Sequence, residues 1–134
     1  MSSFKLRIVT PHGLYYEGEV EILNVRTKNG QMGILAHRLP LATGLEINEM
    51  NFVEKGERKH FALAGGFLYV GKNETTILTD AIESEMSIDL DRALAAKARA
   101  EARLADRQNE KIDIQRAEIA LRKALVRIRV KKGA

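Results

Sequence analysis

The stretch SIDLDRALAAKARAEARLA, residues 87–105, divides this 134-residue chain into two parts of different periodicity. Half of the residues from 92 to 105 are alanine, the residue with the highest intrinsic helix propensity. Ser87 can act as the N-cap, and Asp89 and Asp91 complement the helix dipole in the first turn. The stretch therefore predicts an α-helix whose thin layer of side chains lets another helix approach closely.

A second helix is predicted after a short polar link at residues 106–111. Its apolar residues recur at helical spacing and fall on one stripe: Ile114, Ala117, Leu121, Ala124, Leu125 and Ile128. Two helices joined by a short link form an αα-hairpin. Isolated helices of this length are only marginally stable in water. We therefore expect the hairpin to be stabilised by packing against the rest of the chain, a ligand or a partner.

The residues before 87 carry the signals of short strands. Nine of the ten glycines and both prolines lie within residues 1–71, where apolar and polar residues alternate. Strands are predicted at 4–8, 19–27, 32–35, 50–54, 58–63, 66–70 and 75–79. The predicted fold class is an all-β N-terminal sandwich or flattened barrel, residues 1–86, followed by a C-terminal α-helical hairpin, residues 87–134.

Composition narrows the class of protein. Hydrophobic residues make up 45% and charged residues 30%, which is typical of a globular chain. The absence of cysteine excludes a disulfide scaffold, a thiolate metal site and a cysteine nucleophile. No apolar run approaches the roughly 18 residues of a membrane span, and the N-terminus lacks the apolar stretch of a signal peptide, so we expect no membrane insertion.

Charge is divided between the two parts of the chain. Residues 1–86 carry a net charge of −2 and residues 87–134 a net charge of +6. Both predicted helices place basic residues at spacings of seven and four, near one face: Arg92, Arg99 and Arg103 on the first, and Arg116, Lys123 and Arg127 on the second. Two such ridges on a closed hairpin repel each other unless an anion or an acidic surface lies near them.

Three interpretations of the basic ridges remain open from charge alone. They are two solvated faces, a nucleic-acid-binding hairpin, or a helix lying on a membrane surface. The lack of any aromatic residue from Met86 onward argues against stacking on bases and against membrane-surface binding.

Signals of catalysis are missing, so we expect no catalytic residue, no metal site and no enzyme. His12, His37 and His60 lack the spacing of metal ligands. Residues 66–72 have the G-x4-G-K spacing of a phosphate-binding loop, but Asn73 stands where Ser or Thr would hold magnesium, and the intervening residues form an apolar strand.

A family resemblance covers essentially the whole chain, in order. It rests on these segments: VTPHG at 9–13, YEGEV at 16–20, GILA at 33–36, LPL at 39–41, AGGF at 64–67, TIL at 76–78, AIE at 81–83, IDLDRA at 88–93, RAE at 116–118 and AL at 120–121. Together they resemble the epsilon subunits of bacterial rotary (F-type) ATP synthases. The family fold, a β-sandwich followed by a helical hairpin, agrees with the division derived above.

The resemblance implies a non-catalytic rotor subunit of the F1 part, peripheral at the cytoplasmic face of the bacterial plasma membrane. The sandwich is expected to bind the gamma subunit and the ring of c subunits, and to help couple proton-driven rotation to ATP synthesis. The loop of His37, Arg38 and Pro40 resembles the part that meets the ring. The family usually has a histidine two residues before this proline, where the chain has Arg38.

The resemblance also implies that the hairpin can extend along gamma towards the catalytic alpha/beta hexamer and block ATP hydrolysis. Acidic segments of the hexamer are then the partners of the basic tail, through Arg116, Arg122, Lys123 and Arg127. A nucleic-acid-binding module on a β-domain is the alternative function.

In some family members the closed hairpin binds ATP. IDLDRA at 88–93 matches the I-D-x-x-R-A pattern of that site. The implied ATP site comprises Glu83, Ile88, Asp89, Arg92, Ala93, Arg99, Lys123 and Arg127. No cofactor is required, and ATP, with or without Mg, is expected to be regulatory. The simpler interpretation of Asp89 is that it caps the helix and pairs with Arg92.

Overall fold

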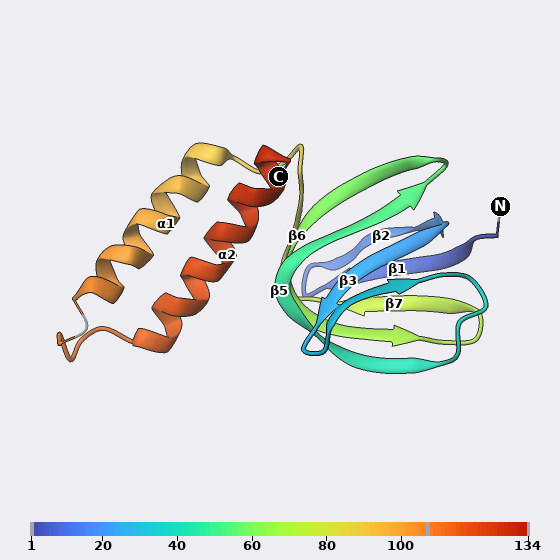
Figure 1. The fold of residues 1–134 in the computed structure, drawn as a ribbon, viewed down its shortest axis with the longest axis horizontal. Helices are drawn as coiled ribbons and strands as arrows, with labels where there is room; N and C mark the ends of the chain where they lie inside the picture. The colour runs from blue at the N-terminus through green and yellow to red at the C-terminus, as the bar shows by residue number, and fades with distance from the viewer. Residues whose placement is uncertain (1, 107, 134) are drawn as a thin grey trace.

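The computed structural model describes residues 2–106 and 108–133 (Figure 1). Eight strands are followed by two helices: β1 Phe4–Thr10, β2 Gly13–Val20, β3 Ile22–Thr27, β4 Gly30–Ile34, β5 Leu41–Glu54, β6 Glu57–Val70, β7 Glu74–Leu78, β8 Ile82–Ser84, α1 Leu90–Ala105 and α2 Ile114–Lys132. The predicted fold class, a β-sandwich followed by a helical hairpin, is confirmed. Residue 107, within the predicted link, lies outside the described residues.

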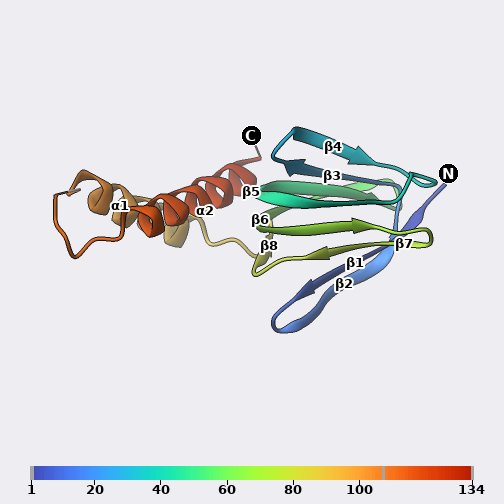
Figure 2. The same cartoon turned by 90° about the horizontal axis from the view of Figure 1, so that it is seen from below.

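The long β5–β6 hairpin belongs to both layers of the sandwich. The strands follow the order β2-β1-β7-β6-β5-β3-β4, and β8 also pairs with β6. The first half of β6 pairs with β8, whereas its second half pairs with β7. Figure 2 shows β3 and β4 on one side of this hairpin and β1 and β2 on the other. Strands β5 and β6 must therefore bend around the core where they pass from one layer to the other.

The bend explains where the predicted strand limits were wrong. Gly65 and Gly66 have φ angles of 82° and 134°, which bend β6 without ending it, so the strands predicted at 58–63 and 66–70 are one. Likewise β5 begins at Leu41 rather than at 50, because it pairs with β6 along almost its whole length. The strand predicted at 19–27 is divided between β2 and β3 at Glu21.

The main core lies between the two layers. It consists of fifteen buried apolar residues, all before residue 83: Leu6, Ile8, Val20, Leu23, Val25, Ile34, Leu45, Met50, Phe52, Phe61, Leu63, Leu68, Val70, Ile77 and Ile82. Phe52 and Phe61 stack at 5.0 Å between ring centroids. The rim of the core is closed by the Tyr16 hydroxyl, which donates to Glu54 at 2.5 Å.

Helix α2 lies between α1 and the sandwich (Figure 1). The two helices bury small residues in the seam between them: Ala93 and Ala100 on α1, Ala117 and Ala124 on α2. The single predicted stripe on α2 is partly wrong, because Leu125 is 41% exposed whereas Val126 and Val130 are buried against the sandwich. An isolated hairpin pattern cannot reveal this second packed face.

Each helix begins at an aspartate. The carboxylates of Asp89 and Asp113 accept hydrogen bonds, both of 3.1 Å, from the backbone amides of Arg92 and Arg116. The N-cap of α1 is therefore Asp89 rather than the predicted Ser87, whose amide and hydroxyl instead donate to the Ser84 carbonyl in the preceding turn. No helix within the described part of the chain is long and apolar enough to cross a membrane.

Candidate binding site between the hairpin and the sandwich

An ion pair joins the hairpin to the last strand of the sandwich. Pairing with β6 places Glu83 of β8 beside the C-terminal half of α2. Its Oε1 lies 2.8 Å from Nε of Arg127, and Oε2 accepts a hydrogen bond of 3.4 Å from Nη2. Both side chains are only partly exposed, so solvent screens this pair less than a surface pair.

Arg127 lines two separate grooves. The larger, about 220 Å³, is lined by Ala62, Leu63, Ala64, Ala81, Ile82, Glu83, Lys123, Val126 and Arg127. The smaller, about 130 Å³, is lined by Arg92, Ala95, Ala96, Arg99 and Arg127. Alanines form part of the walls of both grooves, and Arg127 lines each of them. Because they share Arg127, the grooves make up one candidate site, in which the larger groove is mostly apolar and the smaller one is basic.

The structure brings five of the eight predicted ATP-site residues to these grooves: Glu83, Arg92, Arg99, Lys123 and Arg127. The other three are used otherwise. Ile88 is buried in an apolar cluster against α2, Asp89 caps α1, and Ala93 is buried between the helices. The motif residues 88, 89 and 93 therefore fix the position of Arg92 rather than line the grooves.

The basic end of the site carries an excess of positive charge. Three arginines line the smaller groove, and only Arg127 has a carboxylate partner among the described residues. Guanidinium groups bind phosphate oxygens in a bidentate geometry, and three of them can compensate a polyanion. Within residues 2–106 and 108–133, no group of three or more His, Asp or Glu side chains is arranged to hold a metal ion.

The residues predicted to contact the catalytic hexamer differ in their exposure in this conformation. Arg116, Arg122 and Lys123 are exposed on α2, whereas Arg127 is half-buried against Glu83. In this conformation the guanidinium of Arg127 is engaged by the carboxylate of Glu83.

The predicted ring-contact loop lies at the other end of the molecule. Residues 35–40 join β4 to β5 at the end of the sandwich away from the helices (Figure 1). His37 has a positive φ of 66°, and Nη1 of Arg38 donates to the Gly33 carbonyl at 2.8 Å. The intervening loop is thereby held in a tight turn that leaves Leu39 82% exposed.

An uncovered apolar surface that was not predicted from the sequence lies on the outer face of the β6–β7 pair. Phe67 and Leu78 are cross-strand partners, 57% and 40% exposed, beside a groove of about 300 Å³. Tyr69, two residues along β6, is also exposed. The signal was present in the run FLYV at 67–70, because a strand that is apolar on both faces is typical of one covered on both sides.

Comparisons with known proteins agree with this architecture. Residues 3–85 match the model of the ATP synthase delta/epsilon chain, beta-sandwich domain, and residues 87–132 match the model of its long alpha-helix domain. The chain is 42% identical over 130 residues to the ATP synthase epsilon chain of Bacillus velezensis, covering 97% of this chain and 98% of the relative. It is 44% identical over 126 residues to that of Desulfitobacterium hafniense strain Y51, covering 94% of each.

Solved structures show the same fold. A chain of the Euglena gracilis mitochondrial ATP synthase, from a structure of OSCP, F1 and c-ring, superposes with a TM-score of 0.78 at 23% identity, covering 91% of this chain and 77% of that one. A chain of the Tetrahymena thermophila mitochondrial ATP synthase central stalk and c-ring gives 0.60 at 14% identity, covering 98% and 96%.

A sandwich with a basic helical hairpin is thus the architecture of a class of ATP synthase subunits. The chain belongs to the delta/epsilon-chain family of ATP synthase. The resemblance to epsilon subunits inferred from the sequence is confirmed.

Proposed function

We propose that the chain is a non-catalytic central-stalk (rotor) subunit of the F1 part of ATP synthase. It would lie at the cytoplasmic face of a bacterial plasma membrane, peripheral, and couple proton-driven rotation to ATP synthesis. The observation that carries this proposal, beside family membership, is the uncovered Phe67–Leu78 surface. A strand face that is apolar and unprotected in the isolated chain is typical of a permanent subunit interface.

The gamma subunit is the partner proposed for this surface. Phe67, Tyr69 and Leu78 would supply its apolar centre. The loop of His37, Arg38 and Pro40 would contact the ring of c subunits, with exposed Leu39 at its tip. Both surfaces lie on the sandwich, so they stay engaged if the hairpin moves.

ATP is the proposed ligand of the two grooves. The alanine-lined groove would take the adenine ring, and Arg92, Arg99 and Arg127 would take the phosphates. Glu83 would then either share Arg127 with a phosphate or accept a hydrogen bond from the adenine amino group. Because the grooves are built from both α1 and α2 and from the sandwich, a ligand that spans them stabilises the closed hairpin by mass action.

Inhibition of ATP hydrolysis is the role proposed for the hairpin. On extension, Arg116, Arg122, Lys123 and Arg127 would meet acidic segments of the alpha/beta hexamer. The net charge of +6 on residues 87–134 favours such a partner, and attraction between the charged surfaces speeds their association. The hairpin is then a two-state element whose populations depend on ligand and partner.

A pull-down from the membranes of the source cells tests the proposed function. The full chain is expected to retain gamma in equal amount and no RNA. Phe67→Ser should reduce gamma retention ten- to a hundredfold, because a central aromatic residue of an interface typically contributes about 2 kcal/mol or more. Leu94→Ser, an exposed apolar residue on α1, is the matched control and should leave retention unchanged. Recovery of RNA without gamma would contradict the proposal.

A further inference from the structure

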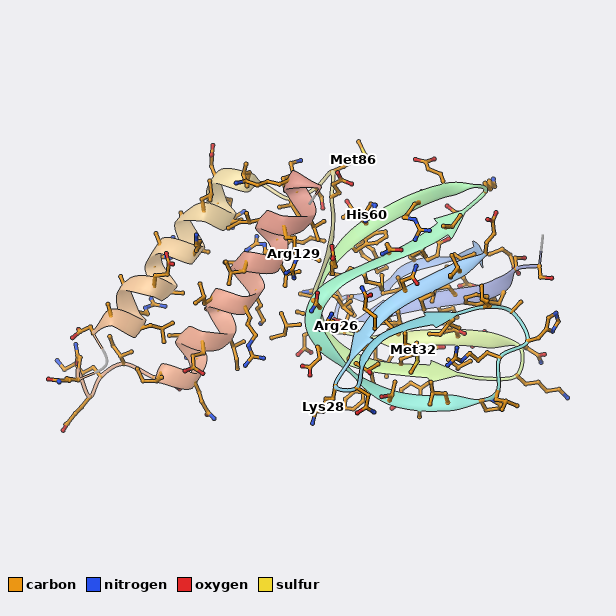
Figure 3. All side chains as sticks on the ribbon, viewed as in Figure 1. Arg26, Lys28, Met32, His60, Met86 and Arg129 are labelled. Carbon is orange, nitrogen blue, oxygen red and sulfur yellow. The ribbon has the colours of Figure 1, made fainter. Side chains whose placement is uncertain are left out.

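A groove of about 400 Å³ opens between β2 and the first half of β6. It shares no lining residue with the two grooves at Arg127 or with the groove beside Phe67 and Leu78. Figure 3 labels two of its lining residues, His60 and Met86, near the link between β8 and α1. Its aromatic lining residues are Tyr15, Tyr16, Phe52 and Phe61.

Two strand edges border this aromatic groove without pairing with each other. Among the described strands, β2 pairs only with β1, and residues 57–60 of β6 pair only with β5. Strand β8 covers the other edge of β6 only at residues 61–63, and one further bond, of 3.0 Å, runs from the Glu85 amide to the His60 carbonyl. The two layers of the sandwich are therefore open at this end, and the groove reaches the aromatic rings of the core.

Tyr15 is directed into the aromatic groove by a β-bulge. Its neighbours Leu14 and Tyr16 face successive residues of β1, so Tyr15 is the extra residue of β2. A bulge turns a side chain out of the regular alternation of its strand. The Tyr15 ring meets the Phe61 ring edge to face, with 6.4 Å between the centroids and 82° between the planes. Because Tyr15 is still 42% exposed, part of its ring is left uncovered as a wall of the groove.

The backbone of Arg58 provides a hydrogen-bond donor and an acceptor at the edge of the aromatic groove. In an antiparallel pair, successive residues alternate between bonding to the partner strand and facing away from it. The His60 carbonyl accepts from Glu85, so residue 60 faces away from β5, and residue 58 does the same two positions earlier. Strand β8 ends at Ser84, and within the described part of the chain no strand pairs with Arg58 on this side.

The formal charges that line the aromatic groove cancel when His60 is counted as neutral. The charged lining residues are Glu57, Glu85, Arg58 and Lys59. Lys59 and the Tyr16 hydroxyl both donate to Glu54, so their polar ends are already engaged within the chain. An ion that enters the groove would lose hydration without gaining an unpaired opposite charge, which favours a neutral ligand.

We propose that the aromatic groove binds a small uncharged aromatic molecule that carries an amide. The ring lies against Phe61 and Tyr15, and the amide accepts from the N–H of Arg58 and donates to its carbonyl. The volume of the groove is within the range of about 300–1,000 Å³ that is typical of sites for small molecules. A second copy of the chain is a poor occupant, because two-fold pairing along β6 would place Arg58 opposite itself. The site does not depend on the proposed function, since it lies apart from both the gamma surface and the nucleotide grooves.

Titration of the full-length chain with benzamide, followed through the NMR shifts of the backbone amides, tests this site. The shifts should be confined to residues 15–16, 57–61 and 84–86, with a Kd in the millimolar range, as expected for a ligand of about nine non-hydrogen atoms. Benzoate, benzylammonium and cyclohexanecarboxamide, which change the charge or remove the aromatic ring, should each bind at least about fivefold more weakly. Saturating benzamide that moves no amide of the groove, or moves mainly those of another groove, would overturn the proposal, as would equally tight binding of all four compounds.

Tyr15→Ala removes one wall of the aromatic groove and should weaken benzamide binding about fivefold, the effect of losing one aromatic contact. Leu14→Ala, at the neighbouring position of β2, is the matched control. Leu14 is 53% exposed and does not line the groove, so its substitution should leave the Kd unchanged. Equal Kd values in the two variants would contradict the site.

Arg58→Pro tests the amide contact, because proline lacks the backbone N–H. The missing N–H points away from β5, so the pairing of β5 with β6 is retained. Binding of benzamide should weaken about fivefold, whereas Arg58→Ala, which loses the same side chain and keeps the N–H, should bind as the natural chain does. The same Kd in both variants would refute recognition of an amide. Shifts of the groove amides that depend on protein concentration without benzamide would show that a second copy occupies the groove, and would overturn the proposal.

Discussion

A fragment that ends at Met86 should fold without the hairpin. All fifteen residues of the main core lie within this fragment, and none of them belongs to the smaller cluster under α2. Removing residues 87–134 uncovers Ala62 and the already partly exposed Ile47. At about 0.8 kcal/mol per buried methyl or methylene group, this exposure should lower the free energy of unfolding of the sandwich by about 2 kcal/mol.

Urea unfolding followed by circular dichroism measures this difference. The fragment is expected to unfold in one cooperative transition, with a smaller dependence on urea than the full chain because less surface becomes exposed. A loss of about 2 kcal/mol leaves a domain of ordinary stability folded. The matching fragment 87–134 is expected to be largely unfolded, because helices of 16 and 19 residues with an alanine seam are marginal alone.

Two results would show that the sandwich does not fold independently of the hairpin. One is a fragment 1–86 that is unfolded in water while the full chain is folded. The other is a loss of more than about 5 kcal/mol, which would mean that the hairpin and the sandwich share one core.

Three further predictions concern single residues. Gly66→Ala should cost more than about 3 kcal/mol in thermal unfolding, because a Cβ there would overlap a backbone oxygen of β7 at a φ of 134°. The Lys59 ammonium and the Tyr16 hydroxyl hold the pKa of Glu54 below its ordinary value, so the stability this carboxylate contributes is present above about pH 4.3 and is lost as pH falls through the lowered pKa. Glu54→Gln should flatten that part of the stability curve. Arg92→Ala should weaken ATP binding in calorimetry at least tenfold, whereas Arg103→Ala should not.

Local sequence signals were sufficient to predict the division of the chain into a β part and a helical part, and to predict most of the turns. Asn29-Gly30 and Lys55-Gly56 mark tight turns between paired strands, as predicted, because their conformations depend on the residues themselves. The period change after residue 86 likewise reflects intrinsic helix propensity. These features depend on a few adjacent residues, so one sequence reveals them.

Long-range pairing accounts for the elements that were missed. The segment 41–49 has little strand character of its own, yet it becomes half of β5 because β6 pairs with it. Locally, two consecutive glycines such as Gly65 and Gly66 predict the end of a strand. In the folded chain they bend β6 without ending it, because both halves of β6 pair with other strands. The second packed face of α2 depends in the same way on the sandwich that it meets.

The sequence predicted which residues the candidate site contains better than it predicted how they are arranged in space. Spacing placed Arg92 and Arg99 near one face of α1, and both line the smaller groove. The Arg127–Glu83 pair joins residues 44 positions apart, and no pattern along the chain indicates it. The exposed Phe67–Leu78 surface is recognisable as a candidate interface only in the folded structure, where no other element covers it.

The proposed function assigns rotor binding to the sandwich and restraint of ATP hydrolysis to the hairpin. The most direct measurement is the ATPase rate of a reconstituted complex that contains the chain truncated after Met86, compared with the full-length chain. We expect faster hydrolysis with gamma still bound in equal amount. Neutralising four basic residues of α2 together should also speed hydrolysis: Arg116, Arg122, Lys123 and Arg127. Unchanged hydrolysis in both complexes, or loss of gamma from the truncated one, would contradict it.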